Sequence, residues 1–131
     1  MSEQPVRVRD VMTSNFQTVD GLMTVKQAIL LMKENNSRLL IVNKRDDNDE
    51  YGIVRFSDIA HDVLSANRSP DRVNIYEVMT KPVVGVDPEM DIRYCARLFQ
   101  RLRFSYAPVI DRGKVLGIVG YTELVLEGLV K

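Results

Sequence analysis

The chain has 131 residues, of which 45% are hydrophobic and 27% charged, as in an ordinary globular protein that can build its own core. Eighteen basic residues balance eighteen acidic ones, which argues against a nucleic-acid partner. The polar start and the short apolar runs predict no signal peptide and no membrane insertion. We therefore expect a cytoplasmic protein in which the single cysteine, Cys95, is a buried reduced thiol.

In chain order, a Val-Met-Thr block at 11–13 precedes an extended segment at 17–19 and a helix. Thr24 and Gln27 have the spacing of a capping box, and apolar residues then recur with helical period: Val25, Ala28, Ile29 and Met32. Two apolar strands follow, at 39–42 and 52–56. A closing helix is expected from Ser57, with Ile59, Val63 and Leu64 on its apolar side. The polar stretch 65–74 reads as a linker.

The same order of elements then occurs a second time. The Val-Met-Thr block returns at 78–80, and Gly-Ile-Val at 52–54 returns at 117–119. Asp91 would cap the second long helix, whose apolar stripe is Ile92, Cys95, Ala96 and Phe99. Strands at 107–110 and 115–119 and a closing helix from Thr122, with Leu124, Leu126 and Leu129, complete the copy. The sequence therefore predicts two βαββα repeats, 1–68 and 69–131, that fold together around one core including Ile41, Val54, Val109 and Val119.

The repeats resemble the cystathionine-β-synthase (CBS) domain, and the pair resembles a Bateman module. The motifs that carry the resemblance are the Val-Met-Thr and Gly-Ile-Val blocks, the 28–32 helix and the Tyr-Ala-Pro-Val-Ile-Asp stretch at 106–111. The resemblance implies an α+β fold of two βαββα CBS repeats packed sheet to sheet with pseudo-two-fold symmetry. It also implies a regulatory homodimer that needs no cofactor, binds AMP, ADP, ATP or S-adenosylmethionine, and acts on an unidentified enzyme or transporter.

In that family the nucleotide-binding stretch reads Gly, two apolar residues, Thr or Ser, two variable residues and Asp. Residues 52–58 keep the acid as Asp58 but place Arg55 at the hydroxyl position, whereas residues 117–123 have Gly120 and Glu123 at these places. The resemblance implies Asp58 as the acceptor for ribose hydroxyls, with Glu123 as the weaker equivalent. Arg55 would offer a phosphate a charge-assisted hydrogen bond in place of the hydroxyl.

A purely structural interpretation of the same residues stays open. Ser57 and Thr122 stand where helix N-caps are expected, and the acid that follows each one would favourably meet the helix dipole. Such a capped helix needs these residue types even when no ligand binds.

Further cleft residues are implied by position in the family. Thr18, Ser37, Arg38 and Leu39 would line the first cleft, and Lys81, Tyr106 and Pro108 the second. Arg38 and Lys81 are the positive groups best suited to an anionic ligand.

The sequence offers no catalytic residues and no metal site. It lacks a Gly-x-Ser-x-Gly motif, a phosphate-binding Gly-Lys-Ser/Thr motif and a nucleophile–base pair, and it has one histidine. Two functions remain: a ligand-sensing module, or a ligand-free dimerisation or scaffold module. A homodimer is predicted because two helices carry more apolar residues than one stripe needs, at Leu30, Leu31, Met32, Leu124, Val125 and Leu126.

Overall fold

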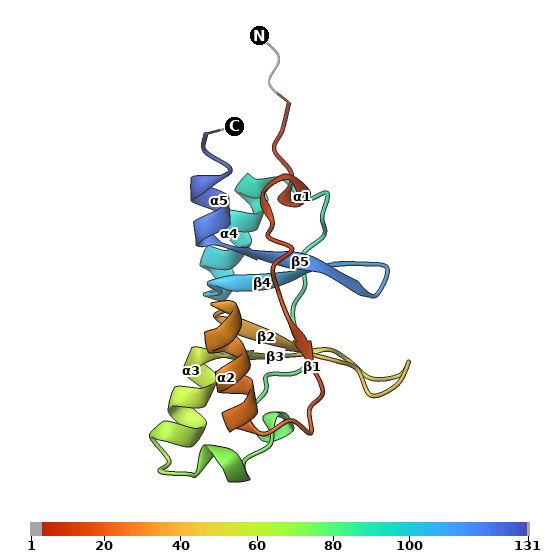
Figure 1. Cartoon of the computed structure of the whole chain (residues 1–131). Helices are drawn as coiled ribbons and strands as arrows, with labels where there is room; N and C mark the ends of the chain where they lie inside the picture. Colours follow the sequence, from red (N-terminus) through yellow and green to blue (C-terminus); the bar gives the residue numbers. More distant parts are fainter. Residues whose placement is uncertain (1–3, 131) are drawn as a thin grey trace. The chain divides into compact units, whose positions relative to one another are not determined.

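The computed structural model describes residues 4–130, which form two compact units (Figure 1). The first-repeat unit is Phe16–Val83. The second-repeat unit joins the N-terminal segment up to Asn15 to the chain from Val84 onward. Each unit is described by itself below. No helix within residues 4–130 has the length and apolar character needed to cross a membrane.

The first-repeat unit contains a three-stranded sheet of order β1-β2-β3. Strand β1 (Thr18–Val19) runs parallel to β2 (Leu39–Val42), and β3 (Gly52–Arg55) pairs antiparallel with β2. Helix α2 (Val25–Asn35) connects β1 to β2, which allows the parallel pairing. After β3 come α3 (Phe56–Ile59), a π-helical turn (Ala60–Leu64) and two 3-10 turns (Pro70–Arg72 and Ile75–Glu77).

Helix α2 confirms the predicted capping box. The Gln27 backbone N–H donates to Thr24 Oγ1 at 3.1 Å, and the Thr24 N–H donates to Gln27 Oε1 at 3.0 Å. Of the predicted stripe, Val25, Ala28 and Met32 are buried, but Ile29 is 37% exposed. The stripe is therefore narrower than expected, and Ile29 lies at its edge.

The predicted linker at 65–74 is wrong at its C-terminal end. Val73 is 1% exposed and its carbonyl accepts the N–H of Val25 at 2.8 Å. Ile75 and Val78, which begin the second repeat, are also buried in the core of the first-repeat unit. The residues after 72 are thus part of the core of the first-repeat unit and not part of a linker.

The second-repeat unit has the same plan. It contains α1 (Val8–Val11), α4 (Ile92–Leu102), the antiparallel pair β4 (Tyr106–Asp111) and β5 (Lys114–Gly120), and α5 (Tyr121–Leu126). Val86 forms a parallel bridge with Val109, equivalent to the pairing of β1 with β2. As predicted, Asp91 caps α4 by accepting the N–H of Arg93 at 2.9 Å, and Cys95 is buried, which raises its pKa to about 11.

Buried apolar residues form one cluster within each unit. Val54 packs in the first-repeat unit, with residues of α2, β2 and the 73–78 segment. Val109 and Val119 pack in the second-repeat unit, where Val8 and Val11 of the N-terminal segment join them.

The two repeats exchange their Val-Met-Thr segments. Thr80 forms an antiparallel bridge with Ile53, with N–H···O distances of 2.8 and 2.9 Å. Thr13 forms the equivalent bridge with Ile118, with both distances 2.9 Å. Each Val-Met-Thr block therefore pairs with the Gly-Ile-Val strand of the other repeat. The repeats predicted at 1–68 and 69–131 are sequence units, while the compact units divide the chain after 15 and after 83.

Candidate functional site

The candidate site in each copy begins at the closing helix, whose cap differs from the prediction. Helix α3 starts at Phe56 with Arg55 as N-cap, and α5 starts at Tyr121 with Gly120 as N-cap. Ser57 and Thr122 are therefore second helical residues and not caps. The side chains that bond back to the N-cap residues are those of the third helical residues, Asp58 and Glu123, each of which accepts the backbone N–H of the N-cap residue at 2.8 Å. This structural role of the two acids is the same in both units.

In the first-repeat unit, Asp58 also binds the side chain of Arg55. Nε of Arg55 donates to Oδ2 at 3.2 Å, and Nη2 donates to Oδ1 at 3.1 Å. The Asp58 side chain is 13% exposed and that of Arg55 is 38% exposed. Nη2 also donates to Oγ1 of Thr80 at 3.3 Å. A guanidinium, a carboxylate and a hydroxyl thus meet at the N-terminus of α3.

The other residues predicted for the first cleft lie in the same unit. Leu39 is directly opposite Arg55 in the β2–β3 register, and it is buried. Thr18 is exposed and pairs with Ile41, while Ser37 is half-buried and donates from Oγ to Gln17 at 2.6 Å. Arg38, which directly precedes β2, is exposed. The structure thus brings Leu39 next to Arg55, and Ser37 is engaged with a neighbouring side chain.

Lys81 was expected beside Tyr106 and Pro108, but it belongs to the first-repeat unit. Its ammonium pairs with Asp49, which also accepts the backbone N–H of Arg45 at 2.8 Å. Lys81 first, and then Arg45, hold the pKa of Asp49 well below its usual range. These residues line a cavity of about 590 Å³ together with Asp20, Gly21, Leu22, Val42, Asn43, Lys44, Tyr76 and Met79.

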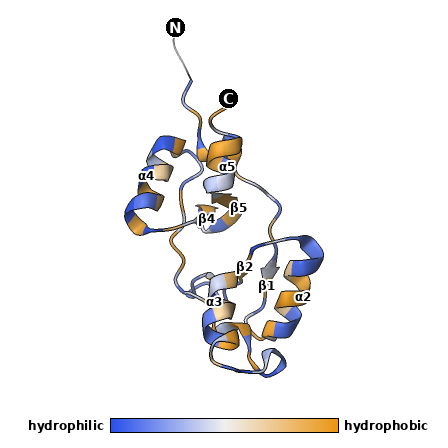
Figure 2. Cartoon of the chain, turned by 90° about the vertical axis from the view of Figure 1, so that its left-hand side faces the viewer, coloured by the Kyte–Doolittle hydropathy of each residue, from blue (hydrophilic) through white to orange (hydrophobic). Residues whose placement is uncertain are grey.

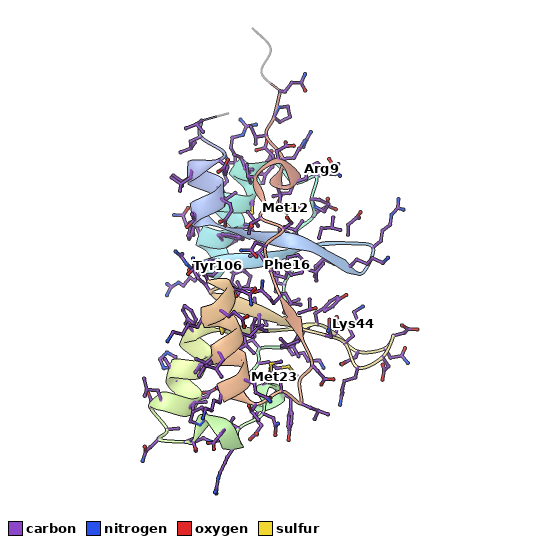
Figure 3. The ribbon with its side chains drawn as sticks, viewed as in Figure 1. Arg9, Met12, Phe16, Met23, Lys44 and Tyr106 are labelled. Carbon is purple, nitrogen blue, oxygen red and sulfur yellow. The ribbon has the colours of Figure 1, made fainter. Side chains whose placement is uncertain are left out.

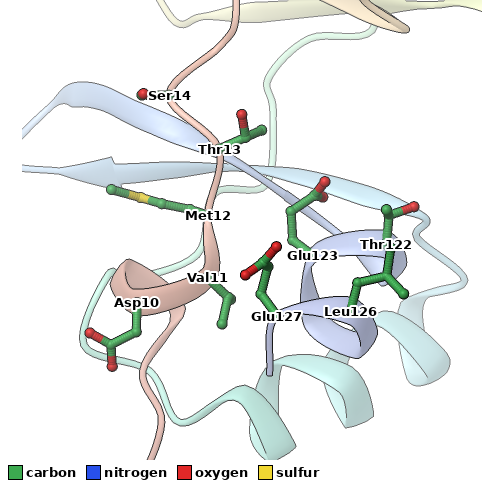
Figure 4. A pocket seen from close by; sticks show the side chains of 9 residues that line it. All are labelled: Asp10, Val11, Met12, Thr13, Ser14, Thr122, Glu123, Leu126 and Glu127. Carbon is green, nitrogen blue, oxygen red and sulfur yellow. The ribbon is translucent and has the colours of Figure 1, made fainter. Parts of the chain in front are cut away.

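Glu123 lines a cavity of about 460 Å³ in the second-repeat unit (Figure 4). Its walls come from α5 and from the exchanged N-terminal segment: Asp10, Val11, Met12, Thr13, Ser14, Thr122, Leu126 and Glu127. Three of the lining residues are acidic, and the lining set contains no lysine or arginine. The cavity therefore favours cationic or neutral groups over phosphates.

Tyr106 and Pro108 lie on β4 of the second-repeat unit. Tyr106, labelled in Figure 3, is opposite Gly120 in the β4–β5 register. A Cβ atom on Gly120 would lie 2.7 Å from Cδ1 of Tyr106. The tyrosine therefore explains why this copy has glycine at the hydroxyl position. Pro108 is buried, and its carbonyl accepts the N–H of Val86 at 2.9 Å.

Sequence reasoning missed Thr13 and Thr80, which the structure places beside the two motif strands. Both belong to the recurring Val-Met-Thr blocks, and that recurrence could have marked them as candidate site residues. The exchange that brings each block to the other repeat depends on tertiary pairing, which a local pattern does not contain. Within residues 4–130, no group of three or more His, Cys, Asp or Glu residues is arranged to hold a metal ion.

Apolar side chains are exposed on both units. Figure 2 colours the chain by hydropathy, and much of α5 is hydrophobic. Of the surplus residues predicted from sequence, Met32 and Leu124 belong to the cores, while Leu30, Val125 and Leu126 are 57%, 49% and 63% exposed. Leu64 and Leu129 were expected to face the cores, but they are 78% and 76% exposed. The apolar surface is thus larger than the sequence indicated.

Comparison with known proteins gives consistent results. Residues 8–65 and 75–129 each match the family model of the CBS domain. The hexameric CBS-CP12 protein from bloom-forming cyanobacteria is 38% identical, with a TM-score of 0.91, over 95% of this chain and 69% of that one. A CBS domain pair solved in complex with 5′-methylthioadenosine and S-adenosyl-L-methionine has the same fold, with a TM-score of 0.81 at 24% identity, over 98% of this chain and 100% of that one.

Among curated proteins, homoserine O-acetyltransferase of Methanosalsum zhilinae is 32% identical over 91% of this chain, but the match covers 23% of the enzyme. The chain spans 58% or less of the length of the first three curated relatives that it matches.

Proposed function

Because the chain belongs to the CBS domain family and carries two copies of the domain, we propose that it is a regulatory module that binds an adenosine-type nucleotide. CBS domain proteins are typically regulatory. The proposed ligand is AMP, ADP, ATP or S-adenosylmethionine, and the proposed target is a partner enzyme or transporter whose activity depends on the bound ligand.

The observation that supports this proposal is the cluster of Arg55, Asp58 and Thr80 at the N-terminus of α3. Asp58 supplies a carboxylate at the motif position that would accept the ribose hydroxyls. Arg55 supplies a guanidinium, which binds phosphates through two parallel N–H donors. One residue set therefore offers a partner to the ribose and a partner to the phosphate of a nucleotide.

The equivalent position in the second-repeat unit is less suited to a phosphate. Glu123 shares its cavity with Asp10 and Glu127, so an anionic group there would meet like charges. At the hydroxyl position, Gly120 offers no side chain, and the space beside it is filled by Tyr106. We therefore assign the nucleotide to the site that carries Asp58.

A ligand-free dimerisation or scaffold module is the second candidate, supported by two observations. Arg55 and Asp58 already satisfy each other without a ligand, as a structural ion pair would. Leu126 and Leu129 expose apolar surface that a second copy of the chain would cover. Self-association is compatible with both candidates, so ligand binding is the property that separates them.

A thermal-shift screen tests the proposal directly. The probes are AMP, ADP, ATP, S-adenosylmethionine, 5′-methylthioadenosine and cyclic dinucleotides. A ligand that binds only the folded state at one hundred times its Kd stabilises it by about 2.7 kcal/mol, which is a clear rise in Tm for a chain of this size. If none of the adenosine-type probes raises Tm, the scaffold function replaces the sensing function.

A further inference from the structure

We infer that Arg55 makes the Asp58 site selective for phosphate-bearing ligands over uncharged adenosine. The inference rests on the proposed nucleotide binding. It goes further because it assigns to the phosphate of the ligand the role of drawing the Arg55 guanidinium away from Asp58. Its basis is the presence of arginine where the family pattern has Thr or Ser. With a hydroxyl residue at that position, Asp58 would keep the backbone N–H as a donor but have no guanidinium over it, whereas the arginine side chain covers it.

The hydrogen bonds of Asp58 show how completely it is covered. Oδ2 accepts the backbone N–H of Arg55 at 2.8 Å and its Nε at 3.2 Å, and Oδ1 accepts Nη2 at 3.1 Å. An ionised carboxylate has about four acceptor positions, so only about one remains. A ribose diol donates two hydrogen bonds. The diol can therefore bind Asp58 only after the guanidinium of Arg55 has moved away.

Moving the guanidinium breaks an ion pair whose carboxylate has little water around it, whereas the Arg55 side chain is 38% exposed. The Asp58 side chain is 13% exposed, so its carboxylate depends on protein or ligand donors once Arg55 has left. The ribose hydroxyls supply those donors in every adenosine derivative. The guanidinium also loses its carboxylate and its bond to Thr80, and a phosphate on the ligand offers it a new anionic partner, which adenosine lacks.

AMP and adenosine isolate this difference, because they share the base and the ribose and differ in the phosphate. Calorimetric titration of the full chain should show that AMP binds about tenfold or more tightly than adenosine, the effect of one charge-assisted interaction. In Arg55→Met the carboxylate keeps only the backbone N–H as a donor, and the phosphate has no guanidinium to bind. AMP should then bind more weakly, adenosine more tightly, and the preference should fall to about twofold or less.

Arg45→Met is the matched control. Arg45 lies in the same unit and bonds Asp49 Oδ2 through its backbone N–H and Nε at 2.8 and 3.2 Å, the same two distances that join Arg55 to Asp58. It stands outside the nucleotide motif, so its loss should leave the preference for AMP unchanged. Far-ultraviolet circular dichroism on each variant establishes that it is folded.

Arg55→Lys provides a second test should Arg55→Met unfold. Lysine keeps the positive charge but cannot form the bidentate hydrogen bonds of a guanidinium. Adenosine should therefore bind Arg55→Lys more tightly than it binds the parent, and AMP should remain the preferred ligand. Equal affinity of the parent for AMP and adenosine, or an unchanged preference in Arg55→Met, would overturn the inference and leave nucleotide binding intact. If neither the parent nor either Arg55 variant binds AMP or adenosine, both the inference and the proposed function are overturned.

Discussion

The sulfur of Met79 lies 2.7 Å from the position that a Cβ atom on Gly52 would occupy. The second-repeat unit has the same arrangement: a Cβ atom on Gly117 would lie 3.0 Å from Sδ of Met12 and 2.7 Å from the carbonyl oxygen of Thr13. The recurring Gly-Ile-Val and Val-Met-Thr blocks are therefore two sides of one contact. Glycine is needed because the partner segment approaches the strand so closely.

Alanine at these two glycines should have unequal effects. In Gly52→Ala the added methyl meets the flexible end of a methionine, which can turn away. In Gly117→Ala it meets backbone oxygen, so the 13–118 bridge itself must shift. We expect Gly117→Ala to cost about 1–3 kcal/mol of unfolding free energy, and Gly52→Ala clearly less. Urea unfolding of both variants measures this, and equal losses would contradict the contact described above.

The exchange of segments predicts which fragments fold. Residues 16–83 contain every element of the first-repeat unit and should unfold cooperatively. Residues 1–68 lack Val73, Ile75 and Val78, each worth about 1.5–3 kcal/mol when buried, and should be largely unfolded or form dimers.

Residues 69–131 lack Val8 and Val11 and should behave like 1–68. Circular dichroism and sedimentation on the three fragments test this. A monomeric, cooperatively folded 1–68 would show that the exchanged segment is dispensable.

Much of the fold was predictable because the repeat copies confirm each other. Thr24 and Asp91 cap helices as expected, since capping depends on neighbours within a few residues. The exchange of the Val-Met-Thr segments was not predictable, because a bridge such as Thr80 to Ile53 joins residues that no local pattern links.

The candidate site was predictable in part. The motif position identified Arg55 and Asp58, but the caps were misplaced on Ser57 and Thr122. Backbone N–H groups at a helix start can be bonded by a carboxylate at the third helical position or by a hydroxyl at the N-cap. The sequence therefore allowed both positions for the start of each helix. Lys81 was grouped with Tyr106 because they belong to the same repeat, whereas the exchange moves it to the other unit.

Asp91 should give the protein a measurable acid sensitivity. Side-chain and backbone hydrogen bonds from Arg93 lower the pKa of Asp91 from 3.8 to about 2. A carboxylate with a lowered folded-state pKa stabilises the protein above its unfolded pKa, and this stabilisation is lost as the pH falls from about 4 to about 2. Asp91→Asn keeps a good N-cap without the charge. Its stability should change less than that of the parent between pH 5 and pH 2, and identical pH profiles would contradict the assignment.

A further prediction concerns self-association through α5 and the residues that follow it. Leu126 and Leu129 are exposed, so replacing both with glutamate should leave the stability of the unit unchanged and prevent apolar association. Light scattering should give about twice the 15.0 kDa chain mass for the parent and the chain mass for the double variant. Leu22→Glu, at a site 72% exposed on the other unit, is the control and should stay dimeric. A monomeric parent at micromolar concentration would contradict the prediction.

The most direct test of the account is calorimetric titration of AMP into the parent, Asp58→Ala and Glu123→Ala. The two variants are matched, because each removes a carboxylate that accepts the N-cap N–H at 2.8 Å. We expect Asp58→Ala to weaken AMP binding by about 1.5–3 kcal/mol, which is about one to two powers of ten, and Glu123→Ala to leave it nearly unchanged. If Asp58→Ala binds AMP as tightly as the parent, or if the parent binds no adenosine-type ligand, the assignment of the nucleotide site to Asp58 is wrong.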